Sequence, residues 1–258
     1  MPGGPSHTKN GGEVWGRCGW PARTPGGRLR RQRDPIPKRE GKVVERQFTN
    51  GRAWLDWMEI GALDLSEIGA VLDVTARGMR DNPLHVAAFG DDPEGRRRSF
   101  RALMAAVFSV RDFSHTLVAR REDGVIVGVC GMMPPGGCRP GIGQQLRLLP
   151  ALIPLGPRTI WRMARWMGAW RKHDPEERHW HLGPLAVDAH LQGEGVGSRM
   201  MGVFCAQMDA AREDAYLETD KEVNVRFYRR FGFEVVAEQK VLGVPNWFML
   251  RHAERRDG

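Results

Sequence analysis

The stretch LQGEGVGSRM, residues 191–200, places three glycines at alternate positions in front of a segment with helical periodicity. Glycine has no side chain, so the backbone amides of such a turn can come close to a ligand. The first amides of a helix have no intrahelical partner and lie at the positive end of the helix dipole. We therefore predict a phosphate cradle here, formed by Gly193, Glu194, Gly195, Val196, Gly197 and Ser198.

The spacing of these glycines excludes one common phosphate loop and weakens another. A Walker loop needs a lysine after its last glycine, and the sequence has none there. A dinucleotide fingerprint, G-x-G-x-x-G, would need glycine at the position of Ser198. An acidic residue, Glu218, does follow the next predicted strand start, so the dinucleotide alternative is weak rather than absent.

The segment EVNVRFYRRF, residues 222–231, has the pattern of a short helix. Phe227 and Phe231 are four residues apart and fit a face that packs on a sheet. Asn224 and Tyr228 are also four apart, on the neighbouring face, where an amide and a phenol can meet one ligand. By composition alone, Tyr228 is as compatible with a core position as with a proton donor.

Candidate proton acceptors lie on two predicted strands. Strand alternation places His179 and His181 on one face of the strand 179–187, and Trp180 and Leu182 on the other. Glu218 lies on the following strand. Each of the three can accept a proton from an amine, but a lone histidine on a strand more often has a structural role, so the identity of a general base stays open.

The elements that must position these groups alternate along the chain from about residue 59. Apolar periodicity and turn residues predict strands and helices, and Ser66 is a candidate N-cap for the first helix. The strands are expected at residues 58–63, 115–133 (a hairpin), 179–187, 215–219, 233–242 and 246–252, and the helices at residues 64–79, 91–110, 195–213 and 222–231, with a helical insert at about 143–172. This order indicates an α/β (α+β) domain.

The helical insert carries a basic aromatic stripe, formed by Trp161, Arg162, Arg165, Trp166 and Trp170. Such a stripe is compatible with a membrane surface. It is more typical of a helix that packs its tryptophans on its own domain, where they could wall an acceptor pocket together with residues 242–247.

The basic charge of the chain is concentrated near its start. The net charge is +8, and residues 1–50 hold 11 Lys and Arg against 4 Asp and Glu. Residues 1–45 are rich in Gly, Pro and Arg, so we expect a disordered tail, followed by a single domain over 46–258. Met58 opens a sequence typical of a natural start. The nearly neutral body argues against an extended phosphate-binding face, so a nucleic-acid partner is not expected, although the tail could recruit one.

The four cysteines have no CxxC spacing, and no Cys/His group has the spacing of a zinc site, so the sequence predicts no metal. Scattered thiols suit a reducing cytoplasm. Cys205 is expected to be a packed small hydrophobe. No apolar run is long enough to span a membrane. A homodimer is compatible with the sequence.

Two longer segments carry a resemblance to a known family. LAVDAHLQGEGVGSRMM, residues 185–201, and AYLETDKEVNVRFYRRFGFEVV, residues 215–236, resemble the GNAT superfamily of N-acetyltransferases. Gln192, Gly195 and Gly197 fill the family's phosphate-loop pattern, Q/R-x-x-G-x-G/A. Within the superfamily, residues 217–233 look most like puromycin N-acetyltransferase and its small-molecule relatives.

The resemblance implies a mixed, mostly antiparallel sheet that is splayed between its fourth and fifth strands, flanked by helices, with acetyl-CoA held in the gap. It implies that the backbone of Leu185, Ala186 and Val187 pairs with the pantetheine arm, and that Gly183-Pro184 supplies a bulge. The pyrophosphate would bind the loop that begins at Gln192.

The resemblance also implies a reaction: acetyl transfer to the primary amine of a small molecule by direct attack. Tyr228 would be the general acid that protonates the CoA thiolate, and Asn224 would contact the cofactor arm. His181 and Glu218 are the preferred candidates for proton acceptance. A CoA-binding module that serves regulation or assembly without catalysis is the alternative.

Overall fold

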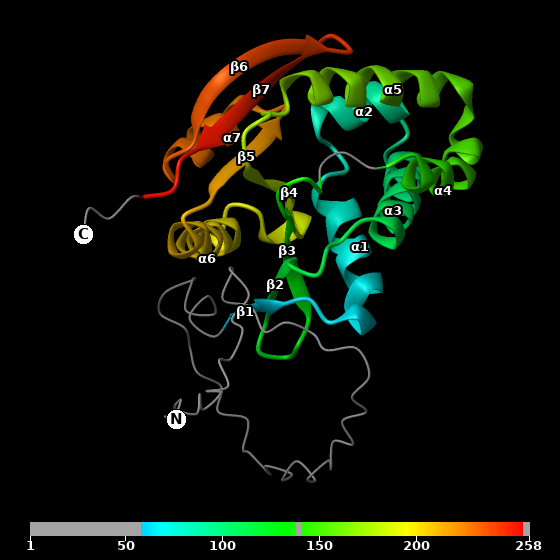
Figure 1. Cartoon of the computed structure of the whole chain (residues 1–258). Coiled ribbons are helices and arrows are strands. Elements are labelled where there is room, and N and C mark those ends of the chain that lie inside the picture. Colours follow the sequence, from blue (N-terminus) through cyan, green and yellow to red (C-terminus); the bar gives the residue numbers. More distant parts are fainter. Residues whose placement is uncertain (1–57, 138–140, 255–258) are drawn as a thin grey trace, which may run out of the picture. The chain divides into compact units, whose positions relative to one another are not determined.

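The computed structural model describes residues 58–137 and 141–254 (Figure 1). The predicted disordered tail, residues 1–45, and two of the four cysteines, Cys18 and Cys138, lie outside the described residues.

Seven strands form one mixed sheet in the order β1-β2-β3-β4-β5-β7-β6. Within the described residues, only β4 and β5 run parallel, and every other neighbouring pair of strands is antiparallel. The predicted mixed, mostly antiparallel sheet is therefore confirmed. The strands are β1 (Glu59–Ala62), β2 (Leu117–Arg120), β3 (Ile126–Met133), β4 (His179–Val187), β5 (Asp214–Thr219), β6 (Glu234–Val241) and β7 (Val244–Arg251).

Helices cover both faces of this sheet (Figure 1). One core cluster joins α6 and α7 to one face, and further clusters join α1, α2, α3 and α5 to the other side. The α-helices are α1 (Ile68–Gly78), α2 (Pro83–Phe89), α3 (Pro93–Val110), α4 (Ile142–Leu152), α5 (Gly156–His173), α6 (Val196–Ala211) and α7 (Glu222–Arg229), and three short 3-10 helices are η2 (Leu65–Glu67), η3 (Ile153–Leu155) and η4 (Ala189–Leu191). Among the described residues, no helix is long and apolar enough to cross a membrane.

The sheet opens between its two parallel strands. β4 and β5 pair at only three positions, and the last pair is His181 with Tyr216. β4 continues to Val187 and β5 to Thr219 without further pairing to each other. On its other edge β4 stays paired to β3 up to Val187. The predicted splay between the fourth and fifth strands is therefore confirmed.

The predicted helical insert before β4 is present and consists of α4, η3 and α5. Trp166 is buried against α2, and the indole of Trp170 donates a hydrogen bond of 3.0 Å to Asn246 Oδ1 on β7. The expectation that the tryptophans pack on their own domain holds for these two. It is wrong for Trp161, which is 58% exposed, because the α5 residues that pack against α2 begin at Trp166, more than one helical turn later.

Candidate active site

The glycine-rich turn forms the start of α6. Gly195 is the N-cap residue with φ of +99°, and Gly193 has φ of +86°, both in the left-handed region that favours glycine. The first turn of the helix closes where the Arg199 amide donates to Gly195 O at 3.1 Å. The amides of Val196, Gly197 and Ser198 precede that bond and are therefore the unpartnered first amides of a helix. An anion at this point meets several N–H groups and a positive dipole.

The side chain of Gln192 holds this turn against the sheet. Its Nε2 donates to Val187 O at 3.2 Å and to Gly78 O, at the end of α1, at 2.9 Å. Gly78 lies against the backbone of Val187 so closely that an added Cβ would collide with the Val187 carbonyl oxygen. Gln192 thus positions the predicted phosphate loop through two backbone carbonyls.

An ion pair fastens the same junction. Arg77 of α1 donates to Asp188 Oδ2 at 2.6 Å, and His190 Nδ1 lies 2.9 Å from the other carboxylate oxygen. Burial would raise the pKa of Asp188, but the hydrogen bond and charge of Arg77, together with His190, outweigh burial and hold that pKa below its usual value. The carboxylate therefore stays ionised at the root of the loop.

The edge of β4 that faces β5 has backbone groups available to a ligand. Leu185, Ala186 and Val187 pair with β3 on one edge, and no described strand pairs with the other edge at these positions. The register between β3 and β4 shifts beside Gly183 and Pro184, so the predicted bulge is present. An extended chain can add to such an edge as a strand does.

Two of the predicted catalytic residues meet where the strands part. His181 Nε2 lies 2.9 Å from Glu218 Oε2, although the two residues are on different strands. Their side chains are only 13% and 3% exposed. A carboxylate oxygen accepts hydrogen bonds, so Nε2 of His181 carries the shared proton when Glu218 is ionised. A buried, hydrogen-bonded imidazole–carboxylate pair can accept a proton from a bound amine.

Tyr228 lies on the other side of the parted strands. It is 7% exposed and packs in the same core cluster as Trp180 and Leu182, which alternate along β4 with His181. Burial, reinforced by nearby Cys130 and Asp220, raises the pKa of the Tyr228 phenol. The phenol therefore keeps its proton at neutral pH, as a proton donor must.

Asn224 has a structural partner. Its Nδ2 donates to Thr219 Oγ1 at 3.1 Å, which ties the first turn of α7 to the end of β5. This bond fixes the amide at the open end of β5, near the predicted course of the cofactor arm.

Cys205 is buried on α6, and burial raises the pKa of its thiol to about 11. This agrees with the expected packing role, because a nucleophilic cysteine needs its thiolate form.

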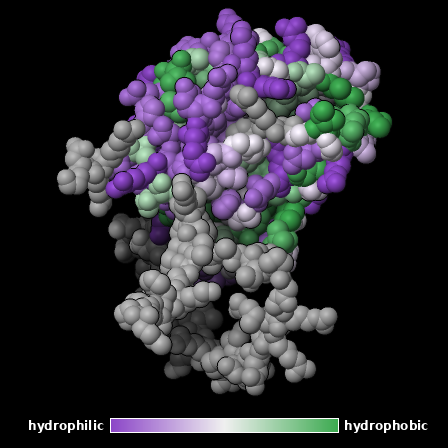
Figure 2. All heavy atoms as spheres, viewed as in Figure 1, coloured by the Kyte–Doolittle hydropathy of each residue, from purple (hydrophilic) through white to green (hydrophobic). Residues whose placement is uncertain are grey.

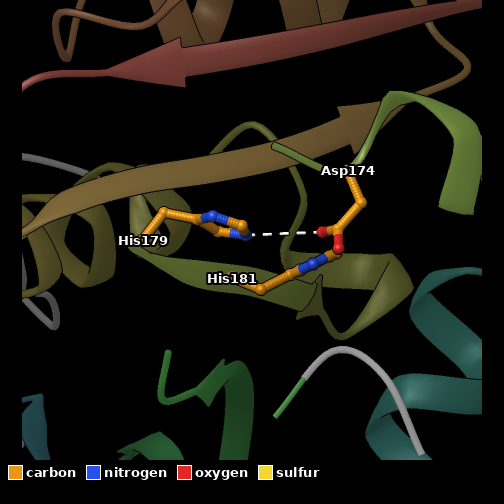
Figure 3. A group of neighbouring side chains, drawn as sticks. All are labelled: Asp174, His179 and His181. Atoms are coloured by element: carbon orange, nitrogen blue, oxygen red, sulfur yellow. Dashed lines mark ion pairs between the residues drawn. The ribbon is translucent and has the colours of Figure 1, made fainter. Parts of the chain in front are cut away.

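Sequence reasoning missed one member of the polar group around His181. Asp174, at the end of α5, and His179 come together with His181, and the three side chains point toward one another (Figure 3). His179 Nε2 lies 3.4 Å from Asp174 Oδ1, and His179 Nδ1 lies 2.8 Å from Glu177 O. The signal available in the sequence was the spacing D-x4-H-x-H before a buried strand.

Other solved proteins share this fold. A Corynebacterium glutamicum protein described as histone acetyltransferase HPA2 and related acetyltransferase aligns with a TM-score of 0.59 and 20% identity, over 78% of this chain and 99% of that one. An agmatine N-acetyltransferase aligns with a TM-score of 0.55 and 15% identity, over 76% of this chain and 100% of that one. The Drosophila melanogaster polyamine N-acetyltransferase, which forms N-acetylagmatine, aligns with a TM-score of 0.52 and 13% identity, over 76% of this chain and 99% of that one.

A family model adds evidence at the level of sequence. The model for the acetyltransferase (GNAT) family matches residues 83–233, a span that runs from α2 through the glycine-rich turn to the end of α7 and makes up more than half of the chain. Together with the splayed sheet and the amide cradle, this match establishes that the chain belongs to the GNAT family of acetyltransferases, enzymes that use acetyl-CoA.

Proposed function

We propose that this acetyltransferase transfers the acetyl group of acetyl-CoA to the primary amine of a small molecule. The observation that carries the proposal is the opening of the sheet beyond the His181–Tyr216 pair. This opening has an unpaired strand edge along its length, amides of a helix N-terminus at one end and an imidazole–carboxylate pair at the other.

The residues of this gap divide the binding of acetyl-CoA between them. The backbone of Leu185, Ala186 and Val187 binds the pantetheine arm as an added strand. The loop of Gln192, Gly193, Glu194, Gly195, Val196, Gly197 and Ser198 holds the pyrophosphate, with Gln192 acting through the backbone that it positions. Asn224 borders the arm from the start of α7.

The proton movements follow from the two sides of the gap. An ammonium has no lone pair, so the His181–Glu218 pair takes a proton from the bound amine. The amine nitrogen attacks the thioester carbonyl to form a tetrahedral intermediate. As this intermediate collapses, the C–S bond breaks with loss of the CoA thiolate, and the nitrogen releases its extra proton to water to leave the neutral amide. Tyr228, whose phenol is protonated at neutral pH, donates its proton to that thiolate and regains a proton from water.

Three observations support a small-molecule acceptor. The net charge of the body of the protein is close to zero, so its overall charge does not favour a highly charged macromolecule as the acceptor. Residues 217–233 resemble the puromycin N-acetyltransferase branch. Structural neighbours include enzymes that are named for agmatine and polyamines. We therefore propose a small primary amine as the acceptor.

An amine library tests this proposal directly. The full chain is incubated with acetyl-CoA and single amines, and free thiol is measured. We expect release with a subset of small primary amines, and a loss of roughly 10²–10⁴-fold in kcat for Tyr228→Phe. The acetyl-CoA Kd of this variant should stay close to that of the wild type.

Two alternatives would give different results: the CoA-binding module considered above, and an acceptor like that of the histone acetyltransferase-related neighbour. A CoA-binding module without catalysis would bind acetyl-CoA and release no thiol with any amine, in the wild type and in Tyr228→Phe alike. A histone-like acceptor would give release with basic peptides and none with small amines.

A further inference from the structure

Four ionisable side chains are buried together next to the gap: Asp174, His179, His181 and Glu218. One ring nitrogen of each histidine and one oxygen of Asp174 all lie within 4.8 Å of one another (Figure 3). Glu218 adds a second carboxylate, 2.9 Å from His181 Nε2. Exposure of these side chains ranges from 3% to 13%. Burying ionisable groups is costly unless opposite charges or metal ions neutralise them.

The hydrogen bonds of His179 fix which of its nitrogens can bind a metal. Nδ1 lies 2.8 Å from the carbonyl oxygen of Glu177, and a carbonyl can only accept, so Nδ1 carries the hydrogen. Nε2 of the neutral ring is then an acceptor that faces Asp174 Oδ1 at 3.4 Å. Two acceptors in such a contact call for a cation between them, either an added proton or a metal ion.

The arrangement matches the requirements of zinc. Zn²⁺ binds imidazole nitrogen and carboxylate oxygen at about 2.0–2.2 Å, so tetrahedral ligands lie about 3.3–3.5 Å apart. The Asp174–His179 separation of 3.4 Å already fits this value. A backbone carbonyl that orients the far nitrogen of a ligand histidine, as Glu177 does, is the usual outer partner of a zinc site.

We propose that Asp174, His179 and His181 form a site for one Zn²⁺ ion, with Glu218 bound either to the ion or to His181. An ion bound there withdraws His181 from proton transfer and so inhibits acetyl transfer. The binding itself is independent of the function proposed above, and the inhibition rests on it.

The primary test measures metal binding in the full, untagged chain. Zn²⁺ affinity and stoichiometry are read by competition with a chromophoric chelator. We expect one tight site per wild-type chain, and affinity at least about 100-fold weaker for Asp174→Asn and His179→Gln, because each loses a ligand. The matched control is His252→Gln, since His252 also contacts a carboxylate, Asp214 Oδ2 at 2.7 Å, but outside the cluster. Equal affinity in Asp174→Asn and the wild type would overturn the proposal.

A second measurement addresses inhibition. Asp174 does not take part in the proposed chemistry, so Asp174→Asn should retain turnover without metal. Micromolar Zn²⁺ should stop the wild type and leave Asp174→Asn active. If the wild type binds zinc but turns over unchanged, the inhibitory role is wrong. If no amine is acetylated, the function proposed above fails while the binding result still stands.

A separate observation concerns the outer face of α4 and η3, which is apolar and exposed. Figure 2 shows hydrophobic residues gathered at the edge where Figure 1 places α4. The spacing of these residues is that of one helix face, and their exposure ranges from 50% to 79%: Ile142, Leu146, Leu149 and Ile153. On α5, Trp161 is also exposed, with the Arg165 guanidinium 5.0 Å from its ring centre.

Charge decides which partner fits this face. Residues 141–173 contain six Lys and Arg and no Asp or Glu, although the body of the protein is nearly neutral. Apolar side chains, an exposed tryptophan and cations without anions match the surface of an anionic lipid bilayer. We infer that α4 and α5 bind such a surface peripherally.

Vesicle sedimentation tests this second inference. The full chain should pellet with vesicles of phosphatidylcholine and phosphatidylserine, and less with phosphatidylcholine alone. The double variant Leu146→Glu/Ile153→Glu should lower the partition coefficient at least about tenfold. The matched control is Val236→Glu, which introduces a glutamate at a 53% exposed position on β6, outside α4 and α5. Both variants retain the basic residues of the segment 1–57, so a difference between them does not come from that segment. Equal pelleting of the double variant, or a dimer that only this variant loses, would contradict the inference.

Discussion

The hydrogen bond between His181 and Glu218 is the chemical centre of the molecule at the scale of single residues. Both residues were predicted from their own strands, but their contact was not, because local patterns do not reveal the register of two parallel strands. In the structure, His181 pairs with Tyr216 in the last rung of the ladder, which brings Glu218 within reach.

Glu218→Gln should separate the two roles of this pair. The amide keeps the size of the side chain but removes the negative charge that stabilises a protonated His181. We expect kcat to fall by about 10²-fold or more, while the acetyl-CoA Kd changes little. Steady-state kinetics with a responsive amine, together with calorimetric binding of acetyl-CoA, measure both quantities.

The matched control is Glu222→Gln, which removes an exposed carboxylate paired with Arg226 on α7. This variant should behave as the wild type does. If Glu218→Gln also kept full turnover, proton acceptance by the His181–Glu218 pair would be ruled out.

At the scale of elements, the sequence predicted nearly every strand and helix but missed α2. The amide of Leu84, in the first turn of α2, donates a hydrogen bond of 2.7 Å to Asp220 Oδ2, and Asp220 lies 136 positions later in the sequence. Asn82, the local N-cap residue, makes no such bond with its side chain. A seven-residue helix stabilised by a distant carboxylate leaves no local signal.

The N-cap expected for the first helix was also wrong. Asp64 caps η2 and forms a reciprocal capping box with Glu67, whereas Ser66 lies within η2 and donates its own amide to Asp64. The strand–turn–helix unit that holds the phosphate loop was predicted more closely, because its apolar run and glycines are local signals.

Two glycines of α1 offer a paired test of how the loop is held. Gly78→Ala places a Cβ against the Val187 backbone, so we expect about 1–3 kcal/mol of destabilisation and weaker acetyl-CoA binding, because the Gln192 contact to Gly78 O is displaced. Gly69→Ala meets no atom within 4 Å and should stabilise the helix by up to about 1 kcal/mol.

Denaturant unfolding and acetyl-CoA titration of both variants measure these effects. Equal acetyl-CoA affinity in Gly78→Ala and Gly69→Ala would mean that the α1–β4 junction does not position the loop.

At the scale of the whole molecule, His85 links stability to pH. His85 belongs to α2, is 3% exposed, and packs against Phe100 of α3 and Trp166 of α5. Its Nδ1 lies 2.6 Å from Met79 O. Burial lowers the pKa of His85 below 6.5, outweighing the Met79 carbonyl and Asp220, which favour the charged form, and Lys221 and Arg96 lower it further.

Because the pKa of His85 is lowered in the folded protein, acid destabilises the folded state. The unfolded chain binds a proton at His85 as the pH falls below about 6.5, and the folded chain resists it, so the free energy of unfolding decreases below that pH. The slope from this group is at most about 1.4 kcal/mol per pH unit. Above pH 7 the contribution is constant.

Guanidinium unfolding between pH 5 and pH 7.5, about the unfolded pKa of histidine, checks this expectation. His85→Asn should flatten the slope, and the exposed His252→Asn should leave it unchanged. An identical slope in His85→Asn would show that another group controls the acid sensitivity.

A diffraction structure of the full chain with acetyl-CoA tests the central claim most directly. We predict the pantetheine arm between β4 and β5 along Leu185–Val187, the pyrophosphate on the amides of residues 195–198, and the sulfur beside the Tyr228 hydroxyl, with His181 and Glu218 facing the acetyl carbon. A cofactor bound elsewhere, or strands that close upon each other while Tyr228 points away from the sulfur, would contradict the mechanism.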